Sequence, residues 1–232
     1  AEYNPFEAVM TNIMGAQNVI NVAIDQKVKK VIALSTDKAA NPINLYGATK
    51  LCSDKLFIAG NSYVGHDHSI FSVVRYGNVI GSRGSVIPHF IKQKETGVFS
   101  ITDSRMTRFW ITLEQGVNFV MKCLEIMVGG ELFVPKIPSM NIMDLAKAIC
   151  SECRTEIIGI RPGEKLHEVM ITKDDARNTV EFENYYVIKS RFLEKRFSSD
   201  LCRPVPEEFE YNSGTNSCWL SVDEIRELIS RL

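Results

Sequence analysis

The 232-residue sequence has no excess of charge of one sign, no long apolar run and no cluster of typical metal ligands. Its formal net charge is -1, so the chain offers no basic field that would attract nucleic acid. No apolar run approaches the roughly 18 residues that a membrane-spanning helix requires. The first residues also lack the basic region and apolar stretch of a signal peptide. We therefore expect a cytoplasmic protein that binds neither nucleic acid nor membranes.

The arrangement of the cysteines gives little sign of function. The six cysteines are scattered through apolar or helical contexts, so we expect reduced thiols, as in most cytosolic proteins. Cys150 and Cys153 form a C-x-x-C pair. A zinc site would need a second pair or nearby histidines, but the next histidine, His167, stands alone. We predict no metal site and interpret the pair as the end of an amphipathic helix.

The first third of the sequence alternates between helical and strand patterns. Residues 4–23 start with an Asn-Pro pair and repeat apolar residues at helical spacing. An apolar run over 28–35 predicts a strand buried on both faces. A second helix is predicted over 46–59, and a further strand over 69–76. This order predicts a parallel α/β sheet, because helices commonly connect parallel strands.

The rest of the sequence continues the mixed pattern. Capping motifs that begin at Thr112, Asn141 and Ser221 each predict the start of a helix. Residues 194–217 are rich in charge, proline and serine, and we expect a long loop there. The other predicted elements are a helix from residue 86, a short segment near 99–101 and a strand over 131–135.

A motif expected of dinucleotide-binding proteins is missing. Such a fold begins with a strand and a G-x-G-x-x-G turn, which places the cofactor pyrophosphate at a helix N-terminus. Gly77, Gly81 and Gly84 have the wrong spacing for this turn, and the sequence begins on a helix without methionine. Either the sequence is a truncated part of a dinucleotide enzyme, or the protein is not such an enzyme.

Tyr46 and Lys50 form a Tyr-x-x-x-Lys pair at the start of the second predicted helix. The spacing places both side chains on one helix face, where the lysine ammonium favours the ionised form of the tyrosine. Tyr185 and Lys189 repeat the motif, but they lie in a strand-like stretch that keeps the two side chains apart. We therefore interpret Tyr46 and Lys50 as the functional pair.

A polar cluster, Ser35-Thr36-Asp37-Lys38, lies at the end of the first predicted strand, about ten residues before Tyr46. Ligands of open parallel sheets bind at the carboxyl ends of the strands. A hydroxyl pair followed by an acid and a base at such an end is suited to catalysis. The alternative is an ordinary helix cap or turn, in which serine, threonine and aspartate are common. The adjacent Tyr-x-x-x-Lys helix favours the catalytic interpretation.

Several stretches of the sequence together resemble one enzyme family. They begin at Ser35 (Ser-Thr-Asp-Lys-Ala), Asn44 (Asn-Leu-Tyr-Gly-Ala-Thr-Lys), Arg75 (Arg-Tyr-Gly-Asn-Val-Ile-Gly-Ser-Arg-Gly-Ser-Val), Thr107 (Thr-Arg-Phe-Trp), Arg161 (Arg-Pro-Gly-Glu-Lys-Leu-His-Glu) and Phe182 (Phe-Glu-Asn-Tyr-Tyr). The sequence resembles the inverting UDP-N-acetylglucosamine 4,6-dehydratases of the extended short-chain dehydrogenase group. These enzymes open the bacterial pathway to pseudaminic acid, a sugar used to glycosylate flagellin. The resemblance runs over almost the whole sequence.

The resemblance implies an α/β fold with a Rossmann-like parallel sheet and a smaller substrate-binding domain. Residues 1–85 would form a partial dinucleotide-binding domain, to which residues 110–135 return. Residues 86–109 and 136–232 would bind the nucleotide sugar. The first βαβ unit, which carries the glycine-rich loop in these enzymes, is expected to be missing, so we expect this piece alone to be inactive.

The resemblance also implies a mechanism. Tyr46 takes the proton of the carbon-4 hydroxyl while a hydride passes to the cofactor, NADP or alternatively NAD. Lys38 removes the proton on carbon 5, which requires a neutral amine, and Asp37, beside Thr36, protonates the departing carbon-6 hydroxyl. The hydride returns to carbon 6, and reprotonation from the opposite face inverts carbon 5. Related retaining dehydratases carry Asp-Glu in place of Asp37-Lys38, which favours the inverting reaction.

Binding residues of the family carry over to the matching positions. A diphosphate needs positive charge and hydrogen-bond donors, which favours arginines within the matched motifs. The residues expected to contact the cofactor are Leu34, Ser35, Tyr46, Lys50 and Val79. The residues expected to contact the UDP-sugar are Asn78, Arg83, Val86, Thr102, Arg108 and Arg161.

Two other functions stay open. A nucleotide-sugar 4-epimerase shares the Tyr46 and Lys50 chemistry but needs no base for carbon 5 and no acid for carbon 6, so Asp37 and Lys38 argue against it. The missing glycine-rich loop also allows an inactive truncated chain or a binding module. The helices over 5–24 and 46–59 pair subunits in this superfamily, so we expect a homo-oligomer.

Overall fold

The computed structural model describes residues 1–63, 69–82, 86–190 and 202–232. The chain divides into two compact units. The first unit comprises residues 1–76, 117–136 and 169–211, and the second comprises 77–116, 137–168 and 212–232. Among the described residues, no helix is both long enough and apolar enough to cross a membrane.

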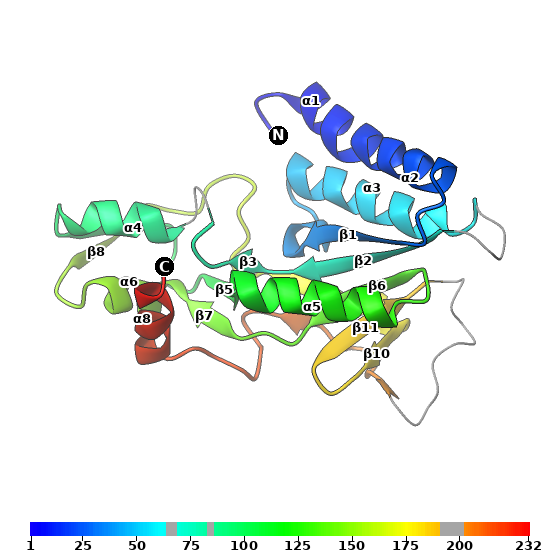
Figure 1. Ribbon diagram of the computed structural model, residues 1–232. Helices are drawn as coiled ribbons and strands as arrows, with labels where there is room; N and C mark the ends of the chain where they lie inside the picture. The colour runs from blue at the N-terminus through cyan, green and yellow to red at the C-terminus, as the bar shows by residue number, and fades with distance from the viewer. Residues whose placement is uncertain (64–68, 83–85, 191–201) are drawn as a thin grey trace. The chain divides into compact units, whose positions relative to one another are not determined.

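The first unit is built on a six-stranded sheet with the strand order β1-β2-β6-β11-β10-β12 (Figure 1). The first three strands run parallel, and the other three are added antiparallel. The strands are β1 (Lys30–Thr36), β2 (Ile70–Tyr76), β6 (Glu131–Pro135), β11 (Tyr185–Lys189), β10 (Thr179–Glu181) and β12 (Arg203–Pro204). The parallel α/β sheet predicted from the sequence is confirmed.

Helices cover both faces of the parallel strands (Figure 1). They are α1 (Pro5–Val9), which continues through a π-helical turn (Met10–Met14) into α2 (Gly15–Asp25), α3 (Leu45–Gly60) and α5 (Leu113–Ile126). Side chains alternate along β2, so Phe71 on one face packs near Phe57 of α3, with the two rings tilted and their centroids 6.4 Å apart. The other face carries Val74, which packs with Cys123 and Met127 around α5.

β1 is less buried than its apolar sequence predicts. Ser35 is buried, but its neighbour Leu34 is 48% exposed. β1 is the edge strand of the described sheet. Ser35 bonds Asp54 of α3, so α3 covers the face of β1 that carries Ser35, and Leu34 lies on the opposite face. The prediction of a strand buried on both faces is therefore wrong for the described residues.

Within its described residues, the second unit combines two small sheets and three helices. β3 (Asn78–Val79) runs parallel to β5 (Thr107–Ile111), which pairs antiparallel with β7 (Ser139–Asn141). β4 (Val98–Ile101) pairs in parallel with β8 (Arg154–Ile157). The helices are α4 (Val86–Lys94), α6 (Ile142–Ile149) and α8 (Val222–Ser230). Phe90, Phe99, Leu145 and Ile225 belong to the apolar core that these elements share.

The predicted capping motifs form as expected. At the start of α5, the Gln115 N–H donates to the Thr112 hydroxyl and the Thr112 N–H donates to the Gln115 side chain, at 3.1 and 3.0 Å. Ser221 and Glu224 form the same reciprocal capping box at α8. The Asn141 side chain accepts from the Met143 N–H at the start of α6. These local bonds fix three helix starts that the sequence indicated.

The region from residue 169 joins the sheet of the first unit. β11 pairs with β6, and β10 pairs with β11, so these strands extend the parallel strands by backbone hydrogen bonds. The family resemblance instead implies that residues 136–232 belong to the nucleotide-sugar-binding domain. The elements that complete this region are β9 (Val169–Ile171), α7 (Lys173–Ala176) and β13 (Tyr211–Asn212). β12 and β13 form within the predicted loop over 194–217, so that loop is partly ordered into short strands.

Cys150 and Cys153 form a disulfide, with their Cα atoms 5.5 Å apart. α6 ends at Ile149, and Cys150 takes an extended backbone with φ -156° and ψ 105°. The chain thereby leaves the helix and turns, which brings the two sulfur atoms together. The expectation of reduced thiols is wrong for this pair, and the pair lies beyond the helix rather than on it.

Candidate active site

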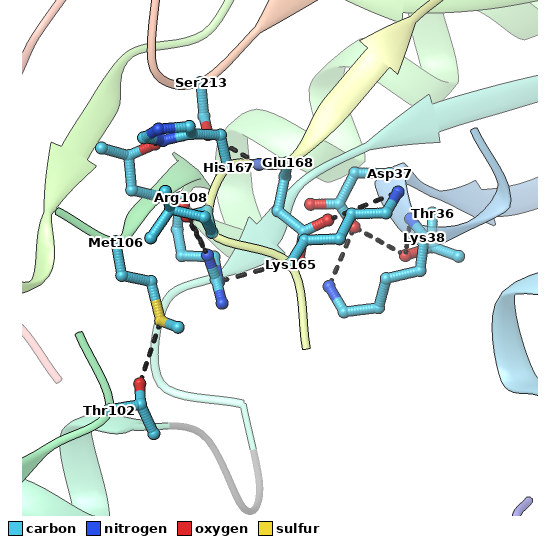
Figure 2. Close-up of polar contacts among 12 residues, drawn as sticks. Thr36, Asp37, Lys38, Thr102, Met106, Arg108, Lys165, His167, Glu168 and Ser213 are labelled. Carbon is cyan, nitrogen blue, oxygen red and sulfur yellow. Dashed lines mark hydrogen bonds and ion pairs between the residues drawn. The ribbon is translucent and has the colours of Figure 1, made fainter. Parts of the chain in front are cut away.

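A hydrogen-bonded cluster lies at the carboxyl end of β1. A single 3-10 turn, η2 (Asp37–Ala39), follows the strand, and Thr36 caps it by accepting from the Lys38 N–H at 3.4 Å. The Thr36 hydroxyl donates to Asp37 Oδ1 at 2.9 Å. Lys38 Nζ lies 3.0 Å from the same oxygen, and Figure 2 shows both side chains converging on Asp37. Thr36 therefore serves as a turn cap and also orients Asp37.

The two carboxylate oxygens of Asp37 have different surroundings. The residue is 0% exposed, and its Oδ1 accepts from both Thr36 and Lys38. Its Oδ2 is buried and has no hydrogen-bond partner among the described residues. A buried polar atom without a partner is unfavourable, and such atoms are uncommon in folded proteins. Oδ2 is thus suited to a partner that arrives with a ligand.

α3 carries the Tyr-x-x-x-Lys pair to this end of β1. The Asn44 side chain caps the helix by accepting from the Gly47 N–H at 2.8 Å. Lys50 Nζ donates to the carbonyl oxygen of Leu34 in β1 at 2.8 Å. Tyr46, one turn earlier on the same face, is 40% exposed. One of the three N–H donors of Lys50 thus holds the helix to the strand, and Tyr46 stays accessible.

The first turn of α3 makes a close backbone contact with η2. A Cβ atom placed on Gly47 would lie 2.1 Å from the carbonyl oxygen of Lys38. Such a distance is far inside van der Waals contact, so a residue with a side chain would force the helix and the turn apart. Glycine at this position therefore brings Tyr46 beside the residues that follow β1.

Tyr76 also lies at the carboxyl edge of the parallel strands, and it is not among the site residues predicted from the sequence. It is the last residue of β2 and pairs with Thr36 in the register of the two strands. Burial raises the pKa of Tyr76, and the nearby Tyr46 raises it further. The place of Tyr76 at a strand end within a matched motif was the signal available in the sequence.

The Ser35 side chain, expected to contact the cofactor, is turned into the protein. Its hydroxyl donates to Asp54 Oδ2 of α3 at 2.7 Å. Arg75 of β2 donates to the same oxygen at 3.1 Å, and both charged side chains are buried. Asp54 and Arg75 are not among the site residues predicted from the sequence. The signal for Asp54 was its spacing, since it follows Lys50 by four residues on the face of α3 that carries Tyr46.

Two of the three arginines expected to contact the diphosphate, Arg108 and Arg161, lie within the described residues and differ in availability. Arg108 donates to the carbonyl oxygens of Thr107 and Leu166, at 2.7 and 3.2 Å, and its Nε lies 3.7 Å from Glu168. Its guanidinium is therefore largely used within the second unit. Arg161 has a side chain that is 64% exposed, with Glu164 at 3.9 Å. Of the two, Arg161 presents the more accessible charge.

The other expected substrate and cofactor contacts also lie in the second unit. The Thr102 hydroxyl contacts Met106 Sδ at 3.3 Å, and Val86 packs on the apolar core at the start of α4. Asn78 Oδ1 is buried and has no hydrogen-bond partner within the described part of the chain. Val79 pairs with Ile111 through β3 and β5. Arg83 lies outside the described residues.

A polar cluster around His167 is a second feature that the sequence did not single out. The Thr107 hydroxyl lies 2.8 Å from His167 Nδ1 and 2.7 Å from the Ser213 hydroxyl. Burial lowers the pKa of His167, and the positive charges of Arg108 and Arg105 lower it further. Figure 2 shows His167 and Ser213 side by side in this unit. His167 is therefore a packed, hydrogen-bonded residue of the second unit.

Comparisons with known proteins agree with this fold and these motifs. The polysaccharide biosynthesis protein family matches residues 1–190. UDP-N-acetylglucosamine 4,6-dehydratase (inverting) of Campylobacter jejuni is 55% identical, over 99% of this chain and 72% of that protein. UDP-glucose 4-epimerase of Rickettsia canadensis is 37% identical, over 100% of this chain and 70% of that protein.

Solved structures extend the likeness to three dimensions. The X-ray structure of Pen from Bacillus thuringiensis matches with a TM-score of 0.88 and 39% identity, over 99% of this chain and 71% of that chain. The fold is also that of dTDP-glucose 4,6-dehydratase from Bacillus anthracis in complex with NAD, with a TM-score of 0.60 and 16% identity, over 70% of this chain and 59% of that chain.

A parallel α/β sheet with a Tyr-x-x-x-Lys helix at its carboxyl edge is the arrangement of the short-chain dehydrogenase class. Within that class, the chain belongs to the polysaccharide biosynthesis protein family. The family resemblance stated from the sequence motifs is confirmed, because the inverting dehydratase relative aligns with nearly the whole chain.

Proposed function

We propose that the protein is a UDP-N-acetylglucosamine 4,6-dehydratase that inverts carbon 5 of the sugar. The single observation that carries this proposal is the contact of Lys38 Nζ with Asp37 Oδ1 at 3.0 Å, beside the helix with Tyr46 and Lys50. An acid and a base held together at the edge where the sugar is oxidised are what a dehydration requires and an epimerisation does not. The identity of 55% to the inverting relative, against 37% to the epimerase, supports the same reaction.

The residues of the first unit fit a nicotinamide cofactor. Tyr46 is exposed at the carboxyl edge of parallel strands, where such ligands bind. Lys50 uses one of its three N–H donors for Leu34, so the ammonium can also bond a ribose hydroxyl. A bound cofactor would supply the hydride acceptor for carbon 4 of the sugar and the hydride donor for carbon 6. We propose NADP on the family resemblance, with NAD as the alternative.

The side chains of the first unit supply the proton transfers. Tyr46, near the positive charge of Lys50, takes the proton of the carbon-4 hydroxyl. The resulting ketone acidifies the hydrogen on carbon 5. Transfer of one proton from Lys38 to Asp37 across their 3.0 Å contact leaves a neutral amine and a carboxylic acid. Lys38 then removes the carbon-5 proton, and Asp37 protonates the carbon-6 hydroxyl, which leaves as water.

The second unit is proposed to bind the UDP-sugar. The exposed charge of Arg161 suits the diphosphate, and Arg108 completes the positive region. The buried Asn78 Oδ1, which has no hydrogen-bond partner in the described ranges, suits a donor from the substrate. We also propose that Val86, Thr102 and Arg83 contact the UDP-sugar.

The proposed biological role follows from the family resemblance. The 4-keto-6-deoxy product would enter pseudaminic acid synthesis for protein glycosylation. We also propose a homo-oligomer paired through α1, α2 and α3. The exposed apolar side chains of Phe6, Met10 and Val22 along the first helices support this pairing.

The reaction run in heavy water tests the proposed function. The full-length protein with UDP-N-acetylglucosamine and NADP should form a 4-keto-6-deoxy sugar of L configuration that carries deuterium at carbon 5. Reprotonation from solvent gives the label, and its delivery to the opposite face gives the configuration. Nuclear magnetic resonance of the product reads both. UDP-N-acetylgalactosamine as the product would establish the epimerase instead, and a D-configured product at early times would exclude inversion.

A further inference from the structure

A buried ion pair that takes no part in the proposed chemistry lies among the active-site elements of the first unit. Asp54 on α3 and Arg75 on β2 are 2% and 3% exposed, and Asp54 Oδ2 lies 3.1 Å from Arg75 Nη2. Ser35 Oγ donates to the same carboxylate oxygen at 2.7 Å. Arg75 Nη1 donates to the carbonyl oxygen of Met170 in β9 at 2.9 Å. One carboxylate oxygen thus connects α3 with β1 and β2, and Arg75 adds β9.

The buried position of the pair disfavours the ionised form of Asp54. Burial raises the pKa of Asp54, while Arg75, Ser35 and Lys50 lower it. Buried ion pairs often stabilise a protein no more than apolar residues of similar volume would. Stability alone therefore does not explain the pair, and the relative position of the elements that it connects is the more specific consequence.

α3 is bonded to β1 at two successive turns of one face. Tyr46, Lys50 and Asp54 are separated by four residues each and share that face. Lys50 bonds the carbonyl oxygen of Leu34, and Asp54 bonds the hydroxyl of Ser35, the next residue of β1. With both bonds formed, α3 can neither slide along β1 nor rotate over it without losing one of them. The first turn of the same face carries Tyr46.

Arg75 fixes the second strand in the same way. Ser35 and Arg75 are partners in the register of β1 and β2, and Thr36 and Tyr76 are the next pair. The ion pair therefore holds α3 on two strands one residue before each strand ends. The residues at those ends are Thr36 and Tyr76.

We infer that Asp54 and Arg75 are positioning residues, whose buried ion pair with Ser35 sets the position of α3 on β1 and β2 and so holds Tyr46 in place relative to Thr36. This inference rests on the proposed dehydration and names residues that act through Tyr46 without touching the substrate. A displacement of about 1 Å of a reacting group can lower turnover by roughly 100-fold.

The double variant Asp54→Val with Arg75→Met separates positioning from stability. Apolar residues of similar volume leave no unpaired charge, so the thermal midpoint is expected to stay near that of the wild type. The expected kcat is about 100-fold lower, while the KM for UDP-N-acetylglucosamine changes by less than about twofold. Steady-state kinetics and thermal unfolding measure these quantities. A double variant that melts like the wild type and keeps its kcat overturns the inference.

Glu131 provides the matched control, since it is a buried carboxylate of the same unit at the opposite, amino end of the parallel strands. It accepts from the Ser72 hydroxyl and from the N–H groups of Val128 and Gly129. Glu131→Gln should leave kcat unchanged at temperatures below its melting transition. The ring resonances of Tyr46, assigned with Tyr46→Phe, should move in the double variant and not in Glu131→Gln. Equal losses of kcat in both variants would overturn the inference.

Ser35→Ala tests the same inference if the double variant does not fold, because it removes only the hydroxyl between β1 and Asp54. The expected result is a kcat about tenfold lower at unchanged KM, as loss of one buried hydrogen bond implies. An unchanged kcat overturns the inference. The wild-type reaction is the reference throughout: if the wild type forms no 4-keto-6-deoxy sugar, the proposed function fails, whereas active wild type with equally active variants contradicts the positioning role alone.

Discussion

At the scale of single residues, Asp37 is buried although one of its carboxylate oxygens has no hydrogen-bond partner among the described residues. The carboxyl group is fully buried, yet within the described ranges of the chain only Oδ1 accepts hydrogen bonds, from Thr36 and Lys38. Leaving a buried polar atom without a partner costs about 1–3 kcal/mol. Buried, under-bonded groups are found at functional sites, where a ligand supplies the missing bond. The arrangement suits a group that must meet a leaving hydroxyl.

Lys38→Met is expected to block the elimination and to leave substrate oxidation intact. Only the amine can take the carbon-5 proton, and methionine keeps the length of the side chain without the base. Positioned acid–base groups typically contribute ~100 to 10,000-fold, so kcat should fall by that range. Steady-state kinetics, with the reduced cofactor followed by its absorbance, measure both steps.

Lys55→Met is the matched control for this variant, because Lys55 lies exposed on α3. It should retain the wild-type kcat. If Lys38→Met keeps its limiting rate and mainly raises the KM, Lys38 holds the substrate as a cation. The epimerase interpretation would then regain support.

At the scale of elements, the contact between α3 and η2 depends on the absence of a side chain. Gly47 lies in the first helical turn, and the carbonyl oxygen of Lys38 occupies the space that a Cβ atom would need. The Asn44 cap orients this turn, and the Lys50 bond to Leu34 anchors the next one. The helix start is therefore placed by a steric fit at one end and a hydrogen bond at the other.

Gly47→Ala is expected to lower both stability and turnover, although alanine is the better helix former. The added Cβ would lie 2.1 Å from the Lys38 carbonyl oxygen, so α3 must move away from η2. Gly15→Ala in α2 is the control, because there the nearest atom lies 3.7 Å away and alanine should stabilise by up to about 1 kcal/mol. Thermal unfolding and kcat measure the two effects. An active, stable Gly47→Ala variant would disprove the steric account.

At the scale of the whole molecule, both units are assembled from stretches that are distant in the sequence. The second unit consists of three stretches, 77–116, 137–168 and 212–232. Thr107, His167 and Ser213 come from one stretch each, and their side chains form one hydrogen-bonded cluster. These hydrogen bonds therefore connect the three stretches of the second unit to one another.

The ionisation of His167 should make the stability of the second unit depend on pH. Its pKa in the folded protein is lowered from 6.5, chiefly by burial, so the unfolded chain binds the proton more tightly. The stabilisation is therefore complete above about pH 6.5 and is lost as the pH falls through the folded pKa. Urea unfolding at pH 7.5 and at pH 5.5 should show this loss. His167→Gln should flatten the dependence, and the exposed His89→Gln should retain it; an unchanged profile in His167→Gln would contradict the assignment.

The sequence by itself determined the local features of the protein. Tyr46 and Lys50 share a face because a helix repeats at about four residues, whatever surrounds it. The polar cluster that contains Asp37 follows β1, because the apolar run that forms the strand ends there. Thr112 caps α5 for an equally local reason, since the two residues of a capping box are only three positions apart. Each of these features depends on a few consecutive residues.

The tertiary structure decided what depends on distant partners. Asp54 and Arg75 are ordinary charged residues in the sequence, and only the packing of α3 on β2 buries and pairs them. The exposure of Leu34 depends on the place of β1 in the strand order. Cys150 meets Cys153 because the backbone leaves the helical conformation at that point. Apart from the disulfide, whose partners are three residues apart, this pairing and burial depend on chain segments far away in the sequence, which a local pattern does not specify.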